Sequence, residues 1–225
     1  MRISLLTDDP SSWFVPYGKN LVDRLAALGH ASEYFFDSRS IPRGDICFLL
    51  SCTKMVNREC LGRNVNNIVV HASDLPLGRG FSPLQWQILG GQSDVVLTLF
   101  EAVEELDAGP HYLKSTVHYE GTELLGELRQ KMAESIIALC VNYAVNRDAH
   151  KPIAQSGTAT FFPRRVAKDD ELDASSSIVG VFNHLRIADN DKHPVFFNYK
   201  GRKYYLKIYA DPVKAGAPAR VLVKP

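Results

Sequence analysis

Short apolar runs alternate along this chain with segments of helical periodicity, and this alternation limits the possible folds more than any other feature. The runs cover residues 3–6, 46–50 and 68–70, and residues 19–29 place apolar side chains at helical spacing before a glycine. Short continuous runs are typical of strands buried on both faces, which require helices to cover them. The pattern predicts a doubly wound α/β fold with a mostly parallel, Rossmann-like sheet.

The polar stretch of residues 146–155 divides the chain into two predicted units. The elements expected before it are strands at residues 95–100 and 112–117 and an amphipathic helix at residues 121–144. The elements expected after it are a strand at residues 159–162, a helix at residues 175–185, and strands at residues 195–199 and 203–209. The sequence therefore predicts a sheet domain over residues 1–148 and a small α+β appendage over residues 149–225.

Composition excludes several classes of protein. The chain has 225 residues, of which 45% are hydrophobic, so it can bury a substantial core. No apolar run approaches the roughly 20 residues of a membrane-spanning helix, and the run at residues 3–6 is too short for a signal peptide, so we expect no secretion. The four cysteines form no CxxC pair and no zinc-like spacing with histidine, which predicts reduced thiols, no metal and a cytoplasmic location.

The net charge of +1 conceals an asymmetry between the two parts of the chain. Residues 1–150 carry 13 Lys and Arg against 18 Asp and Glu, or −5, whereas residues 151–225 carry 13 against 7, or +6. A basic C-terminal third fits an RNA-binding appendage, a wall for an anionic substrate or a merely solvated surface. Charge alone leaves these three interpretations open.

The first strand-to-helix turn, residues 7–13, reads TDDPSSW and contains no glycine. A dinucleotide-binding domain needs glycines there, because the pyrophosphate must approach the helix N-terminus closely. The sequence also contains no GxxxxGKS/T motif. It therefore disfavours a nicotinamide or flavin dinucleotide and excludes a P-loop nucleoside triphosphatase.

His71 and Asp107 are the candidate catalytic residues. His71 follows an apolar strand, at the sheet edge where α/β folds place their ligands, and Asp107 lies in a Gly-Pro turn after the next strand. We expect the two to converge there, and a histidine beside a carboxylate can serve as general base for an attacking amine or hydroxyl. A structural histidine and a turn-forming aspartate fit the same spacing, so spacing alone leaves both interpretations open.

Three linked motifs between residues 71 and 110 resemble the folate-dependent formyltransferases. The motifs are His71-x-Ser73-x-Leu75-Pro, Arg79-Gly80-x-Ser-Pro and Leu-Asp107-Ala-Gly-Pro. The similarity covers roughly residues 45–135. Residues 159–186 are similar, more weakly, to the segment that follows the catalytic domain in transfer-RNA and sugar formyltransferases.

The resemblance implies a reaction in which a primary amine attacks the formyl carbon of 10-formyltetrahydrofolate, an oxyanion forms, and tetrahydrofolate leaves. His71 matches the family's catalytic histidine, which takes up a proton or stabilises the oxyanion, and Asp107 matches the aspartate that orients it. The resemblance also implies that folate is bound by Ser51, Cys52, Thr53, Leu75 and Asp107.

Val69 departs from the family pattern, in which an asparagine two residues before the catalytic histidine donates to the formyl oxygen. Loss of such a donor costs about 3 kcal/mol in known cases. Asn67 is roughly 6–7 Å too far back along the strand, so Gln85 or a backbone N–H must substitute in an active enzyme. We interpret the chain as a divergent active enzyme. The alternative is a catalytically weak homologue that binds folate or a sugar nucleotide.

A nucleotide-linked amino sugar is the formyl acceptor that the sequence favours. A transfer RNA needs a large basic surface, whereas the +6 of the last third is diffuse, and we expect the chain to be too short for the family's RNA-binding domain. A nucleotide sugar needs only a few cations, polar groups and aromatic rings. The candidates are Ser73, Arg79, Gly80, Trp13, Trp86 and Lys19, although both tryptophans also fit core positions.

A methionyl-tRNA formyltransferase-like enzyme is the runner-up. From the resemblance we further expect a place in bacterial surface-polysaccharide synthesis, such as that of O-antigen or lipopolysaccharide. We expect no nucleic-acid and no membrane partner. Edge strands such as residues 195–199 suit a homodimer interface.

Overall fold

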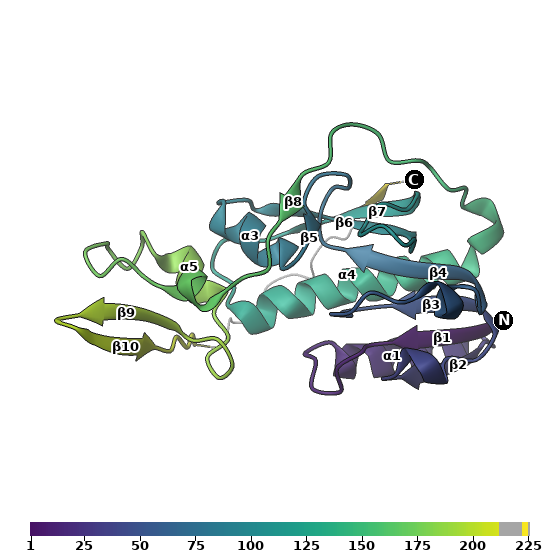
Figure 1. Cartoon of the computed structure of the whole chain (residues 1–225), viewed down its shortest axis with the longest axis horizontal. Helices are drawn as coiled ribbons and strands as arrows, with labels where there is room; N and C mark the ends of the chain where they lie inside the picture. The colour runs from purple at the N-terminus through teal and green to yellow at the C-terminus, as the bar shows by residue number, and fades with distance from the viewer. Residues whose placement is uncertain (212–221, 225) are drawn as a thin grey trace.

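The computed structural model describes residues 1–211 and 222–224, and a central seven-stranded sheet dominates it (Figure 1). The strand order is β11-β7-β6-β4-β3-β1-β2. The strand bounds are β1 Arg2–Leu6, β2 Ala31–Phe35, β3 Gly44–Leu49, β4 Asn64–His71, β6 Asp94–Glu101, β7 His111–His118 and β11 Leu222–Lys224. The apolar runs expected as strands therefore lie at the centre of the sheet.

Strand direction in this sheet changes at β6. β1 pairs in parallel with β2 and β3, and β3 pairs in parallel with β4. β6 is antiparallel to both β4 and β7, so β7 again runs in the direction of β4. The prediction of an α/β fold with a mostly parallel sheet is confirmed, and residues 102–110 form the connection of an antiparallel hairpin.

Helices pack against both faces of the sheet. The helix bounds are α1 Val15–Ala27, α2 Arg58–Leu61, α3 Pro83–Leu89, α4 Leu125–Val145 and α5 Phe182–Arg186, with short 3-10 turns at Ser38–Ser40, Arg147–Ala149 and Ala167–Asp170. α1 and α4 share one apolar cluster with the sheet, and α2 belongs to a second cluster. Within residues 1–211 and 222–224, none of the helices combines the length and apolar character that crossing a membrane requires.

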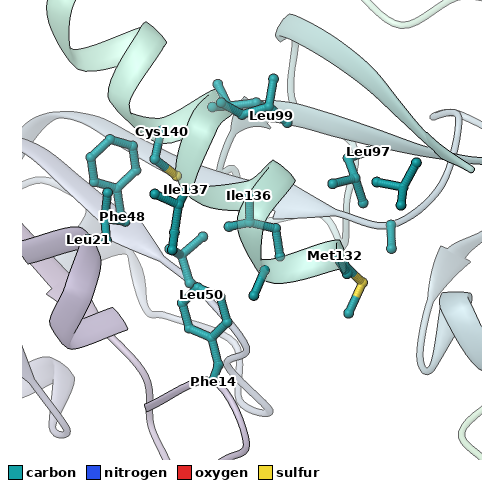
Figure 2. Packing of buried hydrophobic residues seen from close by; sticks show 14 of the residues in the cluster. Phe14, Leu21, Phe48, Leu50, Leu97, Leu99, Met132, Ile136, Ile137 and Cys140 are labelled. Carbon is teal, nitrogen blue, oxygen red and sulfur yellow. The ribbon is translucent and has the colours of Figure 1, made fainter. Parts of the chain in front are cut away.

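The main core lies between the sheet and α4. Figure 2 shows Ile136 and Ile137 of α4 packed with Phe48 and Leu99 of the sheet. Side chains alternate along a strand, so the neighbour of Phe48, Leu49, belongs to the smaller cluster on the opposite face. The functional cavity described below takes side chains from both clusters, Leu50 and Ile136 from the main one and Leu49 and Val69 from the smaller one.

The C-terminal segment, residues 146–211, extends beyond the sheet-containing body, residues 1–145 (Figure 1). It contributes a strand to a small parallel pair with the body, and it forms an antiparallel hairpin of its own. The strands concerned are β5 Arg79–Gly80 of the body, β8 Phe161–Phe162, β9 Val195–Tyr199 and β10 Arg202–Leu206.

Several elements of the C-terminal segment are shorter than the sequence predicts, whereas β9 has the predicted bounds of residues 195–199. The helix expected at residues 175–185 is confined to α5, because polar side chains before it bind nearby backbone instead. The Asp173 carboxylate accepts from the Ser175 N–H at 2.9 Å, and the Ser177 hydroxyl accepts from the Gly180 N–H at 3.1 Å. These local turns keep residues 173–180 out of the helix.

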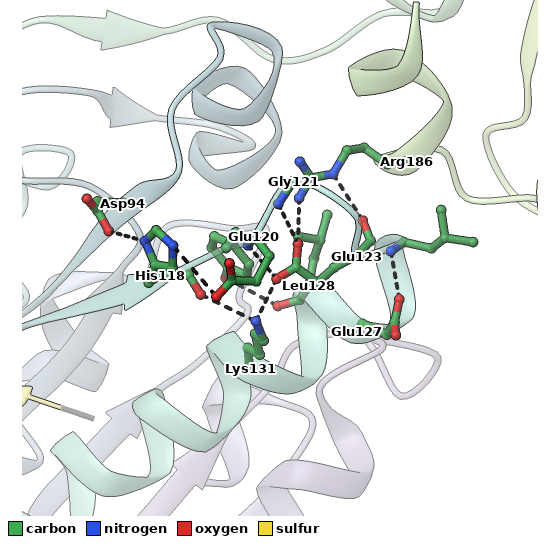
Figure 3. Close-up of polar contacts among 11 residues, drawn as sticks. Asp94, His118, Glu120, Gly121, Glu123, Glu127, Leu128, Lys131 and Arg186 are labelled. Carbon is green, nitrogen blue, oxygen red and sulfur yellow. Dashed lines mark hydrogen bonds and ion pairs between the residues drawn. The ribbon is translucent and has the colours of Figure 1, made fainter. Parts of the chain in front are cut away.

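A buried cluster of charges joins the C-terminal segment to the body (Figure 3). Arg186 of α5 donates through Nη2 to Glu123 Oε2 at 3.1 Å and through Nε to the Glu123 carbonyl oxygen at 3.0 Å. Lys131 of α4 donates to Glu123 Oε1 at 2.6 Å. The side chains of Arg186 and Glu123 are only 4% and 7% exposed, so water screens their contact little.

Candidate active site

His71 ends β4, and its side chain is buried. Its Nε2 lies 2.8 Å from the carbonyl oxygen of Gly78. A carbonyl oxygen only accepts hydrogen bonds, so Nε2 carries the ring hydrogen, and in the neutral ring Nδ1 has the free lone pair. Gly78 therefore holds the imidazole with its basic nitrogen on the side of Asp107.

Asp107 reaches His71 from the hairpin connection between β6 and β7. Because β6 is antiparallel to β4, its last residue pairs with Ile68, and residues 102–110 must fold back to reach the end of β4. Asp107 Oδ2 lies 3.8 Å from His71 Nδ1, too far for a direct hydrogen bond. At that distance the carboxylate still faces Nδ1 of the imidazole. The two residues converge as the sequence predicts, but through an antiparallel hairpin.

The Asp107 carboxylate is also bound by the loop that follows β4. Its Oδ2 accepts a hydrogen bond from the Gly80 N–H at 2.8 Å. Gly80 has φ +105°, and a Cβ there would clash with the carbonyl oxygen of Phe162. Only glycine fits between these groups, so the absence of a side chain is what allows Gly80 to bring its N–H to Asp107.

A cavity of about 640 Å³ opens beside His71 and Asp107. Its walls are largely apolar: Val69 lines it from one face of the sheet, Met132 and Ile136 of α4 line it from the other, and the loops of residues 51–56 and 102–107 also contribute. An apolar cavity of this size with polar groups at one end is suited to a flat heteroaromatic molecule. Among the described residues, no group of three or more His, Cys, Asp or Glu side chains is placed to hold a metal ion.

The position where formyltransferases carry asparagine is apolar in the folded chain as well, because Val69 packs in the cluster on the second face. Asn67 does not replace it, since its Nδ2 donates to the Leu61 carbonyl oxygen at 2.8 Å. Among the described residues that line the cavity, Gln85 is the one carboxamide side chain.

The three predicted folate contacts Ser51, Cys52 and Thr53 all line the cavity. The Thr53 N–H donates to the carboxylate of Asp8 at 2.9 Å. Asp8 belongs to the acidic turn after β1, so this turn holds a loop of the cavity rather than a phosphate. Burial raises the pKa of the Cys52 thiol to about 12, so Cys52 contributes a neutral wall.

The predicted substrate-binding residues are divided between the cavity and other places. Gly80 and Trp13 line the cavity. Ser73 and the predicted folate contact Leu75 are buried outside it, each 2% exposed, and Lys19 is exposed on α1. The Ser73 hydroxyl has no hydrogen-bond partner among the described residues.

Arg79 and Trp86 also lie outside the cavity, where both bind the C-terminal segment. Arg79 Nη2 donates to Gln155 Oε1 at 2.9 Å, and its Nη1 pairs with Glu105 Oε1 at 3.0 Å. Trp86 Nε1 donates to the carbonyl oxygen of Pro163 at 2.8 Å. These side chains help to dock one part of the chain on the other.

Two arginines that the sequence did not single out, Arg129 and Arg164, line the cavity. Arg129 of α4 lies 5.6 Å from the centre of the Trp13 ring and donates to Asp189 at 3.2 Å, whereas Arg164 lies 4.2 Å from the centre of the Phe81 ring. Burial lowers the pKa of Arg129, and Asp189 opposes that shift. The apolar periodicity of α4 identifies only the face of the helix that packs in the core. It could not indicate that Arg129, at the edge of that face, lines the cavity.

Curated relatives match most of this chain but only part of their own length. The methionyl-tRNA formyltransferase of Streptococcus pyogenes is 33% identical over 163 residues, which cover 70% of this chain and 51% of the relative. That of Mesoplasma florum is 28% identical over 149 residues, 63% of this chain and 45% of the relative. The chain thus spans about half the length of the curated relatives it matches. No protein-family model matches it.

Solved structures share the fold over nearly the whole chain at 14–19% identity. A methionyl-tRNA formyltransferase from Clostridium thermocellum has TM-score 0.79 at 18% identity and covers 100% of this chain and 99% of that one. A 4-N formyltransferase from Francisella tularensis has TM-score 0.72 at 14% identity and covers 94% and 98%. HypX from Aquifex aeolicus, solved with tetrahydrofolic acid, has TM-score 0.77 at 19% identity and covers 99% and 40%.

Proposed function

Since this chain belongs to the folate-dependent formyltransferase family, we propose that it transfers a formyl group from 10-formyltetrahydrofolate to a primary amine. The observation that carries the proposal is the convergence of His71 and Asp107, from separate motifs, at the polar end of one cavity. A structural histidine needs no cavity beside its free nitrogen, whereas a general base must reach the proton of a bound substrate, and a carboxylate beside it stabilises the imidazolium that forms.

The cavity fits a reduced folate. Its apolar wall suits a flat bicyclic ring, and the loops of residues 51–56 and 102–107 offer backbone groups to the polar edge of such a ring. The similar structure of HypX was solved with tetrahydrofolic acid, which supports the same class of ligand here. When bound, 10-formyltetrahydrofolate supplies the formyl group, and the side chains of the cavity supply proton transfer and charge stabilisation.

His71 is the proposed proton acceptor. Because Nε2 is engaged by the Gly78 carbonyl, Nδ1 is the nitrogen that can take up the proton lost by the amine. Once charged, the imidazolium is stabilised by Asp107 at 3.8 Å, and it can in turn stabilise negative charge on an oxygen in the cavity.

Gln85 is the proposed replacement for the amide donor that Val69 lacks. It lines the same cavity as His71, and its carboxamide has the chemistry of the asparagine it replaces. Removal of an oxyanion donor lowers kcat about 10²–10³-fold in known enzymes. We expect a loss of that order for Gln85→Leu, and an unchanged kcat would assign the donation to a backbone N–H.

For the acceptor we propose a nucleotide-linked amino sugar. Arg129, Arg164 and Lys54 line the cavity, and two of them lie over the aromatic rings of Trp13 and Phe81. A few cations are enough for a diphosphate, and aromatic rings can stack on a base or a sugar. A similar solved structure, that of a sugar N-formyltransferase from Shewanella, supports an acceptor outside nucleic acid.

Methionyl-tRNA is the second candidate acceptor, which the names of the curated relatives favour. In addition, Lys200, Arg202 and Lys203 on the β9–β10 hairpin lie beside exposed tyrosines, a combination that suits RNA. Binding of RNA through phosphate contacts weakens steeply with salt, whereas binding of one diphosphate depends on salt far less. Salt dependence therefore distinguishes the two acceptors.

The acceptor is tested by incubating the protein with 10-formyltetrahydrofolate and either a panel of nucleotide-linked amino sugars or methionyl-tRNA. Release of tetrahydrofolate with a sugar nucleotide supports the proposal. Salt-sensitive formylation of methionyl-tRNA alone would replace the acceptor. No release with either class, together with intact folate binding, would favour the weak binding homologue.

Variants test the catalytic pair. His71→Ala and Asp107→Ala should each lower kcat about 10²–10⁴-fold, because proton transfer by a positioned side chain contributes that much. Folate binding should change far less. His118→Ala, at an exposed histidine that also meets an aspartate, is the matched control and should keep wild-type kcat. A residue whose removal leaves kcat unchanged does not belong to the pair.

The remaining expectations are kept as parts of this proposal. They are a catalytic domain of residues 1–148 with an appendage of residues 149–225, a homodimer, a cytoplasmic location and a place in surface-polysaccharide synthesis. Residues 212–221 and 225 of the appendage lie outside the described residues, and β11 adds to the edge of the main sheet. Sedimentation of the purified chain tests the homodimer directly.

A further inference from the structure

Gln155, from the C-terminal segment, contacts the loop that carries Asp107. Its Nε2 donates to the carbonyl oxygens of Asp107 and Gly109, both at 2.8 Å. Its Oε1 accepts from Arg79 Nη2 at 2.9 Å, and Nη1 of the same guanidinium pairs with Glu105 at 3.0 Å. The Gln155 carboxamide and the Arg79 guanidinium thus bind every second residue of one loop, Glu105, Asp107 and Gly109.

The backbone around Gln155 is itself bound to the body on both sides. Two residues earlier, Ile153 exchanges N–H to carbonyl hydrogen bonds of 2.8 and 2.9 Å with His111 at the start of β7. Five residues later, the Thr160 carbonyl oxygen accepts from the Arg79 N–H at 2.9 Å. Residues 153–160, which carry the carboxamide of Gln155, are therefore bound to the body at both ends. These backbone hydrogen bonds fix the position of Gln155 without help from the loop of residues 102–110 that it contacts.

The backbone conformation of Asp107 requires hydrogen bonds from residues outside its loop. Its φ is +51°, in the left-handed region, which a residue other than glycine keeps only where its surroundings determine it. The Asp107 carbonyl meets Gln155, and its carboxylate meets the Gly80 N–H. Without the two donors of Gln155, the carbonyls of Asp107 and Gly109 would turn to water, and the carboxylate would move relative to His71.

We propose that Gln155 is a positioning residue of the active site, which fixes the Asp107 carboxylate beside His71. The inference rests on the proposed function, because it assigns Gln155 a part in that reaction. Gln155 does not line the cavity, so it acts through Asp107 and not through the substrates. It follows that the C-terminal segment belongs to the catalytic apparatus, although neither catalytic residue lies in it.

The test compares Gln155→Met, which preserves side-chain length and removes the polar atoms, with Gln130→Met. Gln130 is exposed on α4, where its carboxamide donates to Glu134 at 3.0 Å. We expect Gln155→Met to lower kcat about 10–100-fold, with KM for both substrates within about twofold of wild type. Gln130→Met should keep wild-type kcat. Gln155→Glu, which keeps an acceptor for Arg79 but loses both donors, should resemble Gln155→Met.

A second substitution separates positioning from general weakening of the fold. If Gln155 acts through Asp107, adding Gln155→Met to Asp107→Ala lowers kcat no further, because the carboxylate to be positioned is already absent. An unchanged kcat in Gln155→Met would overturn the inference and leave the proposed function standing. If Gln155→Met lowers kcat by the same factor in Asp107→Ala as in the wild-type protein, the inference is also overturned and the proposed function stands.

Hydrogen–deuterium exchange of residues 101–111 tests the hold on the loop without any reference to activity. We expect faster exchange there in Gln155→Met and unchanged exchange in the rest of the body. If the wild-type protein transfers no formyl group to any acceptor, the proposed function is wrong. In that case unchanged exchange in Gln155→Met would also overturn the claim that Gln155 fixes the loop of residues 101–111. Faster exchange would support that claim.

Discussion

The body and the C-terminal segment are stabilised by different interactions. The body packs one large apolar cluster between the sheet and the helices α1 and α4. The C-terminal segment has only a small cluster around Leu185 and Val195. Its Ile187 joins the large cluster of the body, and hydrogen bonds and ion pairs also hold the two parts together, prominent among them those of Arg79, Arg129 and Arg186.

This difference shows which interactions determine the geometry of the site. Apolar burial is non-directional, so it favours docking of a second segment without fixing its orientation. A buried arginine must meet its acceptors within hydrogen-bond geometry, so several arginines together specify one docked position. Since Gln155 reaches Asp107 from the docked segment, the polar contacts between the two parts also determine the geometry of the catalytic pair.

Truncation of a core side chain in the body should have the largest effect. Phe48 is fully buried in the main cluster, so Phe48→Ala loses apolar burial and leaves a cavity. We expect the free energy of unfolding, measured by urea denaturation, to fall by about 3–5 kcal/mol. Phe36→Ala, at an exposed phenylalanine, is the control and should change it by less than about 1 kcal/mol. Equal losses in the two variants would contradict a body stabilised mainly by this core.

Removal of the carboxylate that meets Arg186 tests the polar side of the comparison. Glu123→Ala leaves a guanidinium that is 4% exposed without its counter-charge. Lys131 is 28% exposed and can turn toward water, so we expect a loss of about 2–3 kcal/mol in urea denaturation, slightly below the usual value for a broken buried pair.

A double variant identifies the source of that loss. Glu123→Leu with Arg186→Met replaces both charges by apolar side chains and should recover most of the stability. If the double variant is no more stable than Glu123→Ala, the loss comes from packing or from the Glu120 and Gly121 N–H groups that donate to the Glu123 carboxylate, and not from an unpaired buried charge.

The contrast between the two parts also explains which features of the fold could be predicted. The apolar runs at residues 46–50 and 68–70 indicated β3 and β4, because burial on both faces leaves a continuous apolar signal. The direction of β6 left no signal, since an apolar run is the same in parallel and antiparallel strands. The helix α3 lies between β4 and β6 in the chain, yet the two strands pair antiparallel.

The candidate site shows the same limit. The motifs around His71 and Asp107 identified the pair through their resemblance to a family, and the folded chain brings the two together. Arg79 was assigned to the substrate as a cation and Trp86 as an aromatic ring, but they bind partners 76 and 77 residues away. Contacts at such separation leave no periodicity or local pattern in one sequence. Gln155 was not identified for the same reason.

Acid should weaken the contact between the body and the C-terminal segment. Burial raises the pKa of Glu123, but hydrogen bonds from Lys131 and from the Glu120 N–H outweigh burial and leave the pKa at about 2. The folded pKa lies below the ordinary value of 4.5, so the ionised carboxylate stabilises the fold above that pH. This contribution is lost as the pH falls toward 2.

The measurement compares urea denaturation of the wild-type protein and of Glu123→Gln as the pH is lowered. The advantage of the wild-type protein should shrink by about 2 kcal/mol between about pH 7 and about pH 3, since each pKa unit corresponds to about 1.4 kcal/mol. Other carboxylates titrate in both proteins, so the difference isolates Glu123. A constant difference over that range would show that ionisation of Glu123 does not stabilise the docked segment.

The smallest effect is expected at an exposed charge pair within the body, also drawn in Figure 3. His118 Nδ1 donates to Asp94 at 2.7 Å, and this hydrogen bond raises the pKa of His118 above 6.5. Stability from a raised pKa is present below about pH 6.5 and is lost as the pH rises through the folded pKa. The two side chains are 56% and 67% exposed, however, so water and salt screen the pair.

His118→Gln should therefore leave the urea midpoint unchanged within error at about pH 6 and at about pH 9. The contact is nearly as short as the one between Lys131 and Glu123, 2.7 Å against 2.6 Å, so the two pairs differ mainly in burial. A loss at the lower pH as large as that of Glu123→Ala would mean that pairing alone gives these contacts their strength. No change would mean that a charge pair stabilises this fold only where the docked segment and the body exclude water from it.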